Sequence, residues 1–209
     1  MKSLLFSRNP FGDESLQREL WEAATKGDLE TVKRLSRIVP DINWADPEYR
    51  RTCFFRACGH GKSEVVKFLL ANPKVNVCQP NSENCSPLFI AAQEGNTAVV
   101  ELLLKDGRCK ANEQEIQGST PLFIACQNGH VDIVKLLLEE PTVDINMARK
   151  DHVAPIFMAA CNGQTKCVQL LLASDKGVDL NVTWSQKSIR DISVQEGRDD
   201  IVKVILNLI

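Results

Sequence analysis

The chain lacks an excess of positive charge. Its 25 Lys and Arg residues are matched by 27 Asp and Glu residues, which gives a formal net charge of -2 at pH 7. Proteins that bind nucleic acid usually carry a basic surplus, because they neutralise phosphates. We therefore expect no nucleic acid partner, although this overall balance does not exclude a local basic patch.

Long apolar runs are also missing. A helix that crosses a bilayer needs about 20 consecutive apolar residues, and no run of that length occurs in the sequence. Near the N-terminus, Arg8 interrupts the apolar residues 4–6, whereas a secretory signal needs an apolar run of about 7–15 residues. We expect neither a membrane partner nor a signal peptide.

Paired metal-ligand and catalytic motifs are absent from the sequence. The eight cysteines form no Cys-x-x-Cys pair, and there is no glycine-rich phosphate loop, His-Glu-x-x-His or Gly-x-Ser-x-Gly. A disulfide framework is typical of short secreted chains instead. The sequence therefore predicts reduced thiols, no metal or other cofactor, no catalytic residues and no small-molecule substrate. It favours a cytoplasmic protein, with the nucleus as the alternative.

What the chain does have is one pattern that recurs every 34 residues. Its clearest column is made of glycines: Gly27, Gly61, Gly95, Gly129, Gly163 and Gly197. A valine column keeps the same period: Val32, Val66, Val100, Val134, Val168 and Val202. A leucine column does so too: Leu35, Leu69, Leu103, Leu137 and Leu171, with Ile205 last. Aligned columns over six units indicate a repeat architecture.

Each unit is expected to form two short helices. The first follows a pair such as Thr120-Pro121, in which the hydroxyl can cap free N–H groups and proline fits the first turn. Gly129 then ends this helix, and residues 133–138 have the apolar spacing of a second one. One unit cannot bury both helices alone, so neighbouring units must stack. We predict an all-α solenoid of helix-turn-helix units with short β-turn or hairpin connections.

Three consecutive segments carry a family resemblance. The segment Thr120–His130 reads Thr-Pro-Leu-Phe-Ile-Ala-Cys-Gln-Asn-Gly-His, and the apolar pattern of Ile133–Leu138 and then Val143–Asn146 follow it. These residues resemble the ankyrin repeat, and the resemblance covers residues 16–209 with about six repeats. It implies the ankyrin fold and a role in binding proteins. In two respects the chain departs from the family: its units have 34 rather than the usual 33 residues, and aromatic residues occupy the usual histidine position.

The expected domain organisation follows from the repeat. We predict a flexible N-terminal tail over residues 1–14 and an ankyrin-repeat domain over residues 15–209. The units lie near residues 18–51, 52–85, 86–119, 120–153, 154–187 and 188–209. The final helix is very apolar for a free end. A partner could cover it, although we expect a monomer.

The aromatic column allows two interpretations. It contains Trp21, Phe55, Phe89, Phe123 and Phe157. These rings could form an exposed apolar ladder for a partner, or they could pack unit against unit in the core. A column of such regularity is typical of a core, and we favour that interpretation.

The resemblance places the contact surface on the concave side, made by the turn tips and the first helices. Exposed tips on a rigid stack suit this role, and Trp, Tyr and Arg are enriched at interface hot spots. The predicted contact residues at the tips are Trp44, Tyr49, Arg50, Arg51, Glu83, Ile116, Gln117, Arg149, Lys150, His152 and Trp184. Those on the first helices are Lys26, His60, Gln93, Glu94, Gln127, Asn128 and Asn162. The rings of Trp44 and Trp184 could equally pack back on neighbouring turns.

Two short signals stand outside the repeat pattern. Asn9-Pro10-Phe11 resembles the tripeptide that EH domains bind in endocytic traffic. A proline-containing entry into the first helix, with Phe11 packed on it, is the stronger interpretation. Asn43 and Asn146 resemble the ankyrin asparagines that oxygen-dependent hydroxylases modify. The plain alternative is that these amides hold the turn by hydrogen bonds.

The sequence thus favours a non-catalytic module that binds another protein, as an adaptor, a scaffold or an inhibitory subunit. The alternatives are a regulatory or targeting subunit of an enzyme complex, or an endocytic-traffic adaptor that acts through residues 9–11. An enzyme with a site grafted on a turn is a weaker interpretation, because fold alone does not decide function. A nucleic-acid binder is weaker still.

Overall fold

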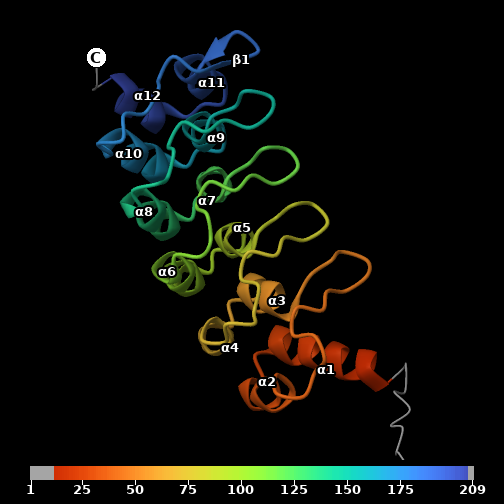
Figure 1. Ribbon diagram of the computed structural model, residues 1–209. Coiled ribbons are helices and arrows are strands. Elements are labelled where there is room, and N and C mark those ends of the chain that lie inside the picture. The colour runs from red at the N-terminus through yellow and green to blue at the C-terminus, as the bar shows by residue number, and fades with distance from the viewer. Residues whose placement is uncertain (1–11, 207–209) are drawn as a thin grey trace, which may run out of the picture.

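The structure of the protein is a computed structural model that describes residues 12–206, with side chains from residue 14 onward. These residues form an all-α solenoid in which helices follow one another in antiparallel pairs (Figure 1). The first helices of the pairs are α1 (Gly12–Lys26), α3 (Cys53–Gly59), α5 (Pro87–Gln93), α7 (Pro121–Asn128), α9 (Pro155–Cys161) and α11 (Ile189–Gln195). The second helices are α2 (Leu29–Leu35), α4 (Ser63–Leu70), α6 (Thr97–Asp106), α8 (Val131–Glu139), α10 (Thr165–Ala173) and α12 (Asp199–Leu206).

Helix α1 begins earlier than the sequence suggested. It starts at Gly12, so residues 12–14, which the sequence predicts to belong to the flexible tail, are helical. The tripeptide Asn9-Pro10-Phe11 lies outside the described residues, and its role as a linear motif stays a prediction.

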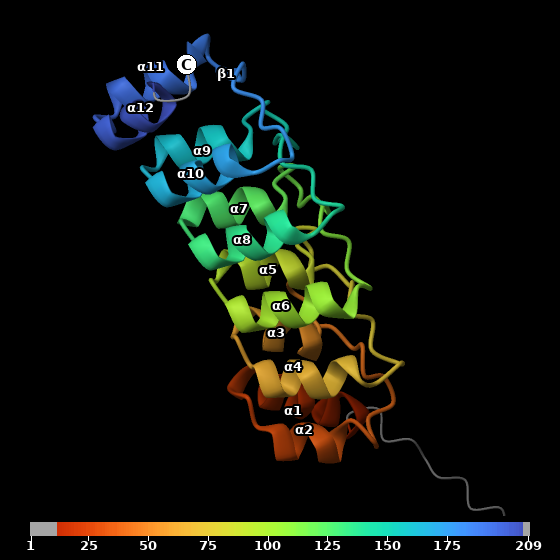
Figure 2. The same ribbon diagram turned by 90° about the vertical axis from the view of Figure 1, so that its left-hand side faces the viewer.

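The helices pack in two parallel rows. Each first helix contacts the first helix of the next pair, and each second helix contacts the next second helix. Figure 2 shows the row of second helices in front of the row of first helices. The units therefore touch mainly their immediate neighbours, as expected of a solenoid.

The repeated columns form the core of this stack. Val66, Val100 and Val134 of the valine column are completely buried, and so are the leucines that follow them by three residues. The aromatic column is buried as well. The exposed fractions of Phe55, Phe89, Phe123 and Phe157 are 4%, 3%, 0% and 1%. The core interpretation of this column is confirmed, whereas Trp21 in the first unit is only half-buried.

The ends of the first helices follow the expected capping chemistry. The side chains of Thr52, Ser86 and Thr120 each accept a hydrogen bond from the backbone N–H of the residue that follows three positions later in the chain. The backbone of Gly129 has φ 74° and caps α7 in the left-handed conformation, as glycine does most easily.

Long loops project from the first-helix side of the stack (Figure 1). They comprise residues 44–52, 79–86, 113–120, 147–154 and 183–188. The last of these is a small antiparallel hairpin of β1 (Thr183–Trp184) and β2 (Lys187–Ser188). Within residues 12–206, no helix is long and apolar enough to cross a membrane.

Candidate binding face

One side of the solenoid combines the first helices with the five projecting loops, and we call it the inner face. Side chains close most of these loops from within. The carboxylate of Asp46 accepts hydrogen bonds from the backbone N–H groups of Tyr49 (2.9 Å) and Arg51 (2.8 Å). Asn81 and Glu115 make the same pair of bonds in the next two loops. These three loops are therefore held in a defined shape rather than left as open coil.

Neighbouring loop tips are joined to one another by backbone hydrogen bonds. The N–H of Ser82 donates to the carbonyl of Tyr49 (2.8 Å), and the N–H of Ile116 donates to that of Glu83 (3.0 Å). The N–H of Lys150 continues the series to the carbonyl of Gln117 (3.0 Å). These bonds tie the first four loops into one continuous ladder, so that their outward side chains keep a fixed spacing.

A left-handed residue makes the close approach of these tips feasible. It recurs at the same repeat position as Arg50, Asn84, Gly118 and His152, with φ between 55° and 91°. At Gly118 a side chain would also collide, because a Cβ atom there would lie 2.9 Å from the backbone nitrogen of Lys150. The missing side chain of Gly118 therefore leaves room for the backbone of the next loop at this point.

Most of the predicted contact residues lie exposed on the inner face. The exposed ones are Lys26, Tyr49, Arg50, His60, Glu83, Glu94, Ile116, Gln117, Asn128, Lys150, His152, Asn162 and Trp184. Lys26, His60, Glu94, Asn128 and Asn162 stand at one repeat position and form a row along the ends of the first helices. The half-buried ones are Trp44, Arg51, Gln93, Gln127 and Arg149.

Several predicted contact residues also hold the stack together. The amide of Asn128 donates to the carbonyl of Gln93 (3.0 Å), and the amide of Asn162 donates to that of Gln127 (3.0 Å). Arg149 forms an ion pair with Asp151 in its own loop. These groups have partners within the chain, so they are less available for a new contact than the freely exposed side chains.

The two tryptophans of the loops differ in their surroundings. Trp44 is half-buried and lines a hollow together with Trp21 and Asp46, which agrees with packing back on the chain. Trp184 is 43% exposed, although the edge of its ring meets Phe157 with 6.4 Å between the ring centroids. Trp184 is therefore the more accessible of the two rings.

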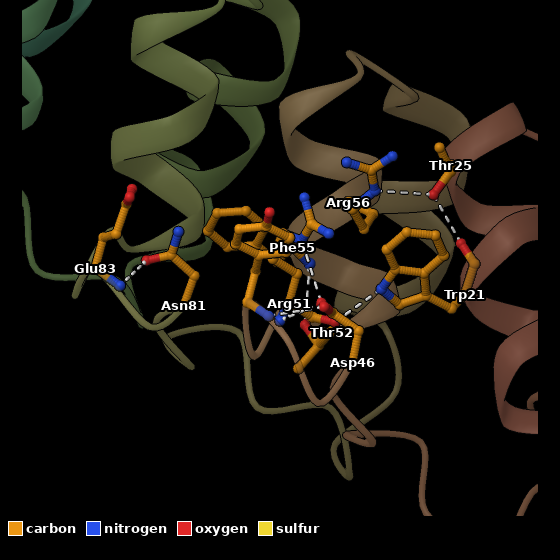
Figure 3. A network of polar contacts seen from close by, with 10 residues as sticks. Trp21, Thr25, Asp46, Arg51, Thr52, Phe55, Arg56, Asn81 and Glu83 are labelled. Carbon is orange, nitrogen blue, oxygen red and sulfur yellow. Dashed lines mark hydrogen bonds and ion pairs between the residues drawn. The ribbon is translucent and has the colours of Figure 1, made fainter. Parts of the chain in front are cut away.

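A cluster of aromatic rings and guanidinium groups lies at the N-terminal end of the inner face (Figure 3). The indole N–H of Trp21 donates to the carbonyl of Arg51 (2.8 Å), and the guanidinium of Arg56 lies over the same indole at 4.5 Å. Arg51 lies over Tyr49 at 4.3 Å and forms an ion pair with Asp46 (3.1 Å). Cation–π contacts of this kind fix the position of long side chains.

Charge is distributed unevenly within this cluster. Burial raises the pKa of Asp46, but hydrogen bonds from Arg51 and from the backbone outweigh it, so that the pKa lies below its ordinary value of 3.8. Burial and then the neighbouring Arg51 charge lower the pKa of Arg56. Arg56 donates from Nε to the hydroxyl of Thr25 (3.2 Å), but no carboxylate of the described residues is within ion-pair distance of it.

Neither Trp21 nor Arg56 is among the contact residues predicted from the sequence. Trp21 occupies the aromatic column, which looked like core. Arg56, however, stands where the following units have Ile90, Ile124 and Met158. The change from charged residues in the first two units, Glu22 and Arg56, to apolar residues in the later units was the available signal.

A cavity of about 350 Å³ opens on the inner face beside this cluster. Its lining combines Tyr49, Phe55 and Arg56 with Glu83 from the loop before α5 and Glu94 from the C-terminal end of α5. The cavity lies where the projecting loops meet the first helices. The inner face is therefore hollowed at this point and carries both signs of charge.

The two asparagines predicted as possible hydroxylation sites, Asn43 and Asn146, form hydrogen bonds within the chain. Asn146 donates from its amide to the carbonyl of Gly177 (2.9 Å) and accepts from the N–H of Asp179 (2.8 Å). Asn43 makes the equivalent pair of bonds to Lys74 and Asn76. The interpretation of these asparagines as turn-holding residues agrees with this geometry, and their hydroxylation stays a prediction.

Among residues 12–206, no group of three or more His, Cys, Asp or Glu side chains could hold a metal ion, and the eight cysteines are free thiols. The sequence matches the family model described as Ankyrin repeats (3 copies) over residues 20–115, 78–149 and 107–184. No curated protein matches the chain.

Proposed function

Because the chain belongs to the ankyrin-repeat family, we propose that it is a non-catalytic module that binds another protein on its inner face. Ankyrin repeats generally mediate protein–protein interaction. In this proposal each of the six helix pairs is one repeat, and the protein acts as an adaptor, a scaffold or an inhibitory subunit. It works as a monomer in the cytoplasm or the nucleus.

The tip ladder is the observation that carries this proposal. It presents exposed and chemically different side chains, such as Tyr49, Glu83, Ile116 and Lys150, in a fixed series. A binding surface gains affinity when its groups are held in place before the partner arrives, because less entropy is lost on binding. The buried columns supply the rigid support behind it.

We call the opposite side of the solenoid, formed by the second helices, the outer face. It is a natural control, because it has exposed charges but no projecting loops. Lys67 and Lys135 are exposed there on the second helices α4 and α8. In the test, Arg50→Glu with Lys150→Glu on the inner face is compared with Lys67→Glu with Lys135→Glu on the outer face. Both double variants change the net charge by the same amount.

Each protein is immobilised, and the proteins captured from a cell extract are quantified by mass spectrometry. We expect the inner-face variant to lose about tenfold or more of the specifically captured protein, and the outer-face variant to retain it. Thermal unfolding shows whether both variants remain folded. Equal capture by the two folded variants would count against the inner face as the binding site.

A further inference from the structure

We infer that the cavity between α3 and α5 receives a linear segment of the partner protein that carries one acidic and one basic side chain. The acidic side chain binds Arg56, and the basic one lies against Glu83 and Glu94. This inference rests on the proposed function and assigns a ligand chemistry to one part of the inner face.

The cavity owes its space partly to Gly59. The equivalent positions of the units on either side are occupied by Thr25 and Gln93. A Cβ atom at Gly59 would already lie 3.1 Å from the side chain of Ile90, which forms part of the same lining. With no side chain at this position, the floor of the cavity stays open and apolar.

The wall on the side of α3 is positively charged. Arg51 is neutralised by Asp46, but Arg56 has no acidic partner among the described residues. Its ring contact with Trp21 and its bond to Thr25 hold the guanidinium in place without satisfying its charge. A partly buried charge without a partner is unfavourable, and a carboxylate that binds two guanidinium N–H groups at once would relieve it.

The wall on the side of α5 is negatively charged. Glu83 and Glu94 are exposed, and within residues 12–206 neither forms an ion pair. Figure 3 shows Glu83 with Asn81 on one side of the view and Arg56 with Trp21 on the other. Opposite charges on the two walls favour an occupant whose own charges have the reverse arrangement.

Selection from a library of random linear peptides displayed on phage tests the inference. We expect the peptides selected on the wild-type protein to share an acidic residue followed or preceded by a basic one. Their dissociation constants are then measured by fluorescence polarisation against the wild type, Arg56→Gln, and Glu83→Gln with Glu94→Gln. Lys67→Gln on the outer face is the matched control.

A double-mutant cycle makes the assignment specific. Replacing the acidic residue of the peptide by its amide should weaken binding to the wild type about tenfold, as expected for loss of a hydrogen bond to a charged group. The same replacement should have no effect on binding to Arg56→Gln. Arg56→Lys keeps the charge without the planar fork and should recover only part of the affinity. Thermal unfolding confirms that each variant is folded.

The outcomes separate this inference from the proposed function. Peptides that bind equally to Arg56→Gln but weakly to Gln117→Arg or Lys150→Gln overturn the cavity and leave the inner face as the binding site. Peptides indifferent to every inner-face variant contradict both. A library that yields no peptide above background also overturns the inference, since it specifies a linear segment. Protein capture by the inner-face variants then still tests the proposed function alone.

Discussion

Replacing Phe123 by alanine probes the stack at its centre. The ring is completely buried in α7, and the guanidinium of Arg149 lies 5.4 Å from its centroid. A buried aromatic side chain removes about 150–250 Å² from water, at about 25 cal/mol per Å². Because alanine keeps a small part of that area and a cavity remains, we expect Phe123→Ala to lower the free energy of unfolding by about 3–5 kcal/mol.

Urea-induced unfolding, followed by far-ultraviolet circular dichroism, measures this change. Ile116→Ala is the matched control, because Ile116 is an apolar side chain on a loop tip of the preceding unit and is 47% exposed. The control should change the free energy of unfolding by no more than about 0.5 kcal/mol. If Phe123→Ala unfolds at the same urea concentration as the wild type, the aromatic column does not form the core between units.

Three further predictions concern the loops and the repeat itself. The lowered pKa of Asp46 contributes stability that is present above its unfolded value, 3.8, and is lost as the pH falls through the folded pKa. When urea unfolding is measured at several acidic pH values, the free energy of unfolding of Asp46→Asn should therefore fall less steeply with pH than that of the wild type. If both proteins show the same dependence on pH, this carboxylate has no role in it. Asn146→Ala removes two hydrogen bonds between units and should lower the free energy of unfolding by about 1–2 kcal/mol, whereas no change would mean that water replaces both bonds. Deletion of residues 86–119 should leave a shorter folded protein with a cooperative thermal transition, and deletion of only residues 86–102 should not; complete unfolding of the first deletion would refute a stack held by neighbouring units alone.

The sequence was sufficient to predict the core because each column meets the same surroundings in every unit. Val100 and Phe123 are buried for the same reason as their equivalents one period away. The period also identified Gly129 as a helix end, since a left-handed residue is needed there in each unit. Features that recur with the period could therefore be predicted from a single sequence.

Features that break the period could not be predicted in this way. The contact of Arg56 with Trp21 joins residues of different units, and it depends on the direction that each side chain takes. Arg51 and Arg149 were predicted as contact residues, but each folds back on a carboxylate of its own loop. The sequence shows that acidic residues are near, yet the loop backbone decides which of them an arginine reaches.

Site-specific photo-crosslinking shows which face of the solenoid contacts a partner protein. A photoreactive amino acid replaces Glu94 or Gln117 on the inner face, or Lys67 or Glu101 on the outer face, all of which are exposed. The four proteins are irradiated in the same cell extract. We predict crosslinks to a specific protein from the two inner-face positions and only background from the two outer-face positions. Equal crosslinking from both faces, or crosslinking from the outer face alone, would mean that the inner face is not the binding surface.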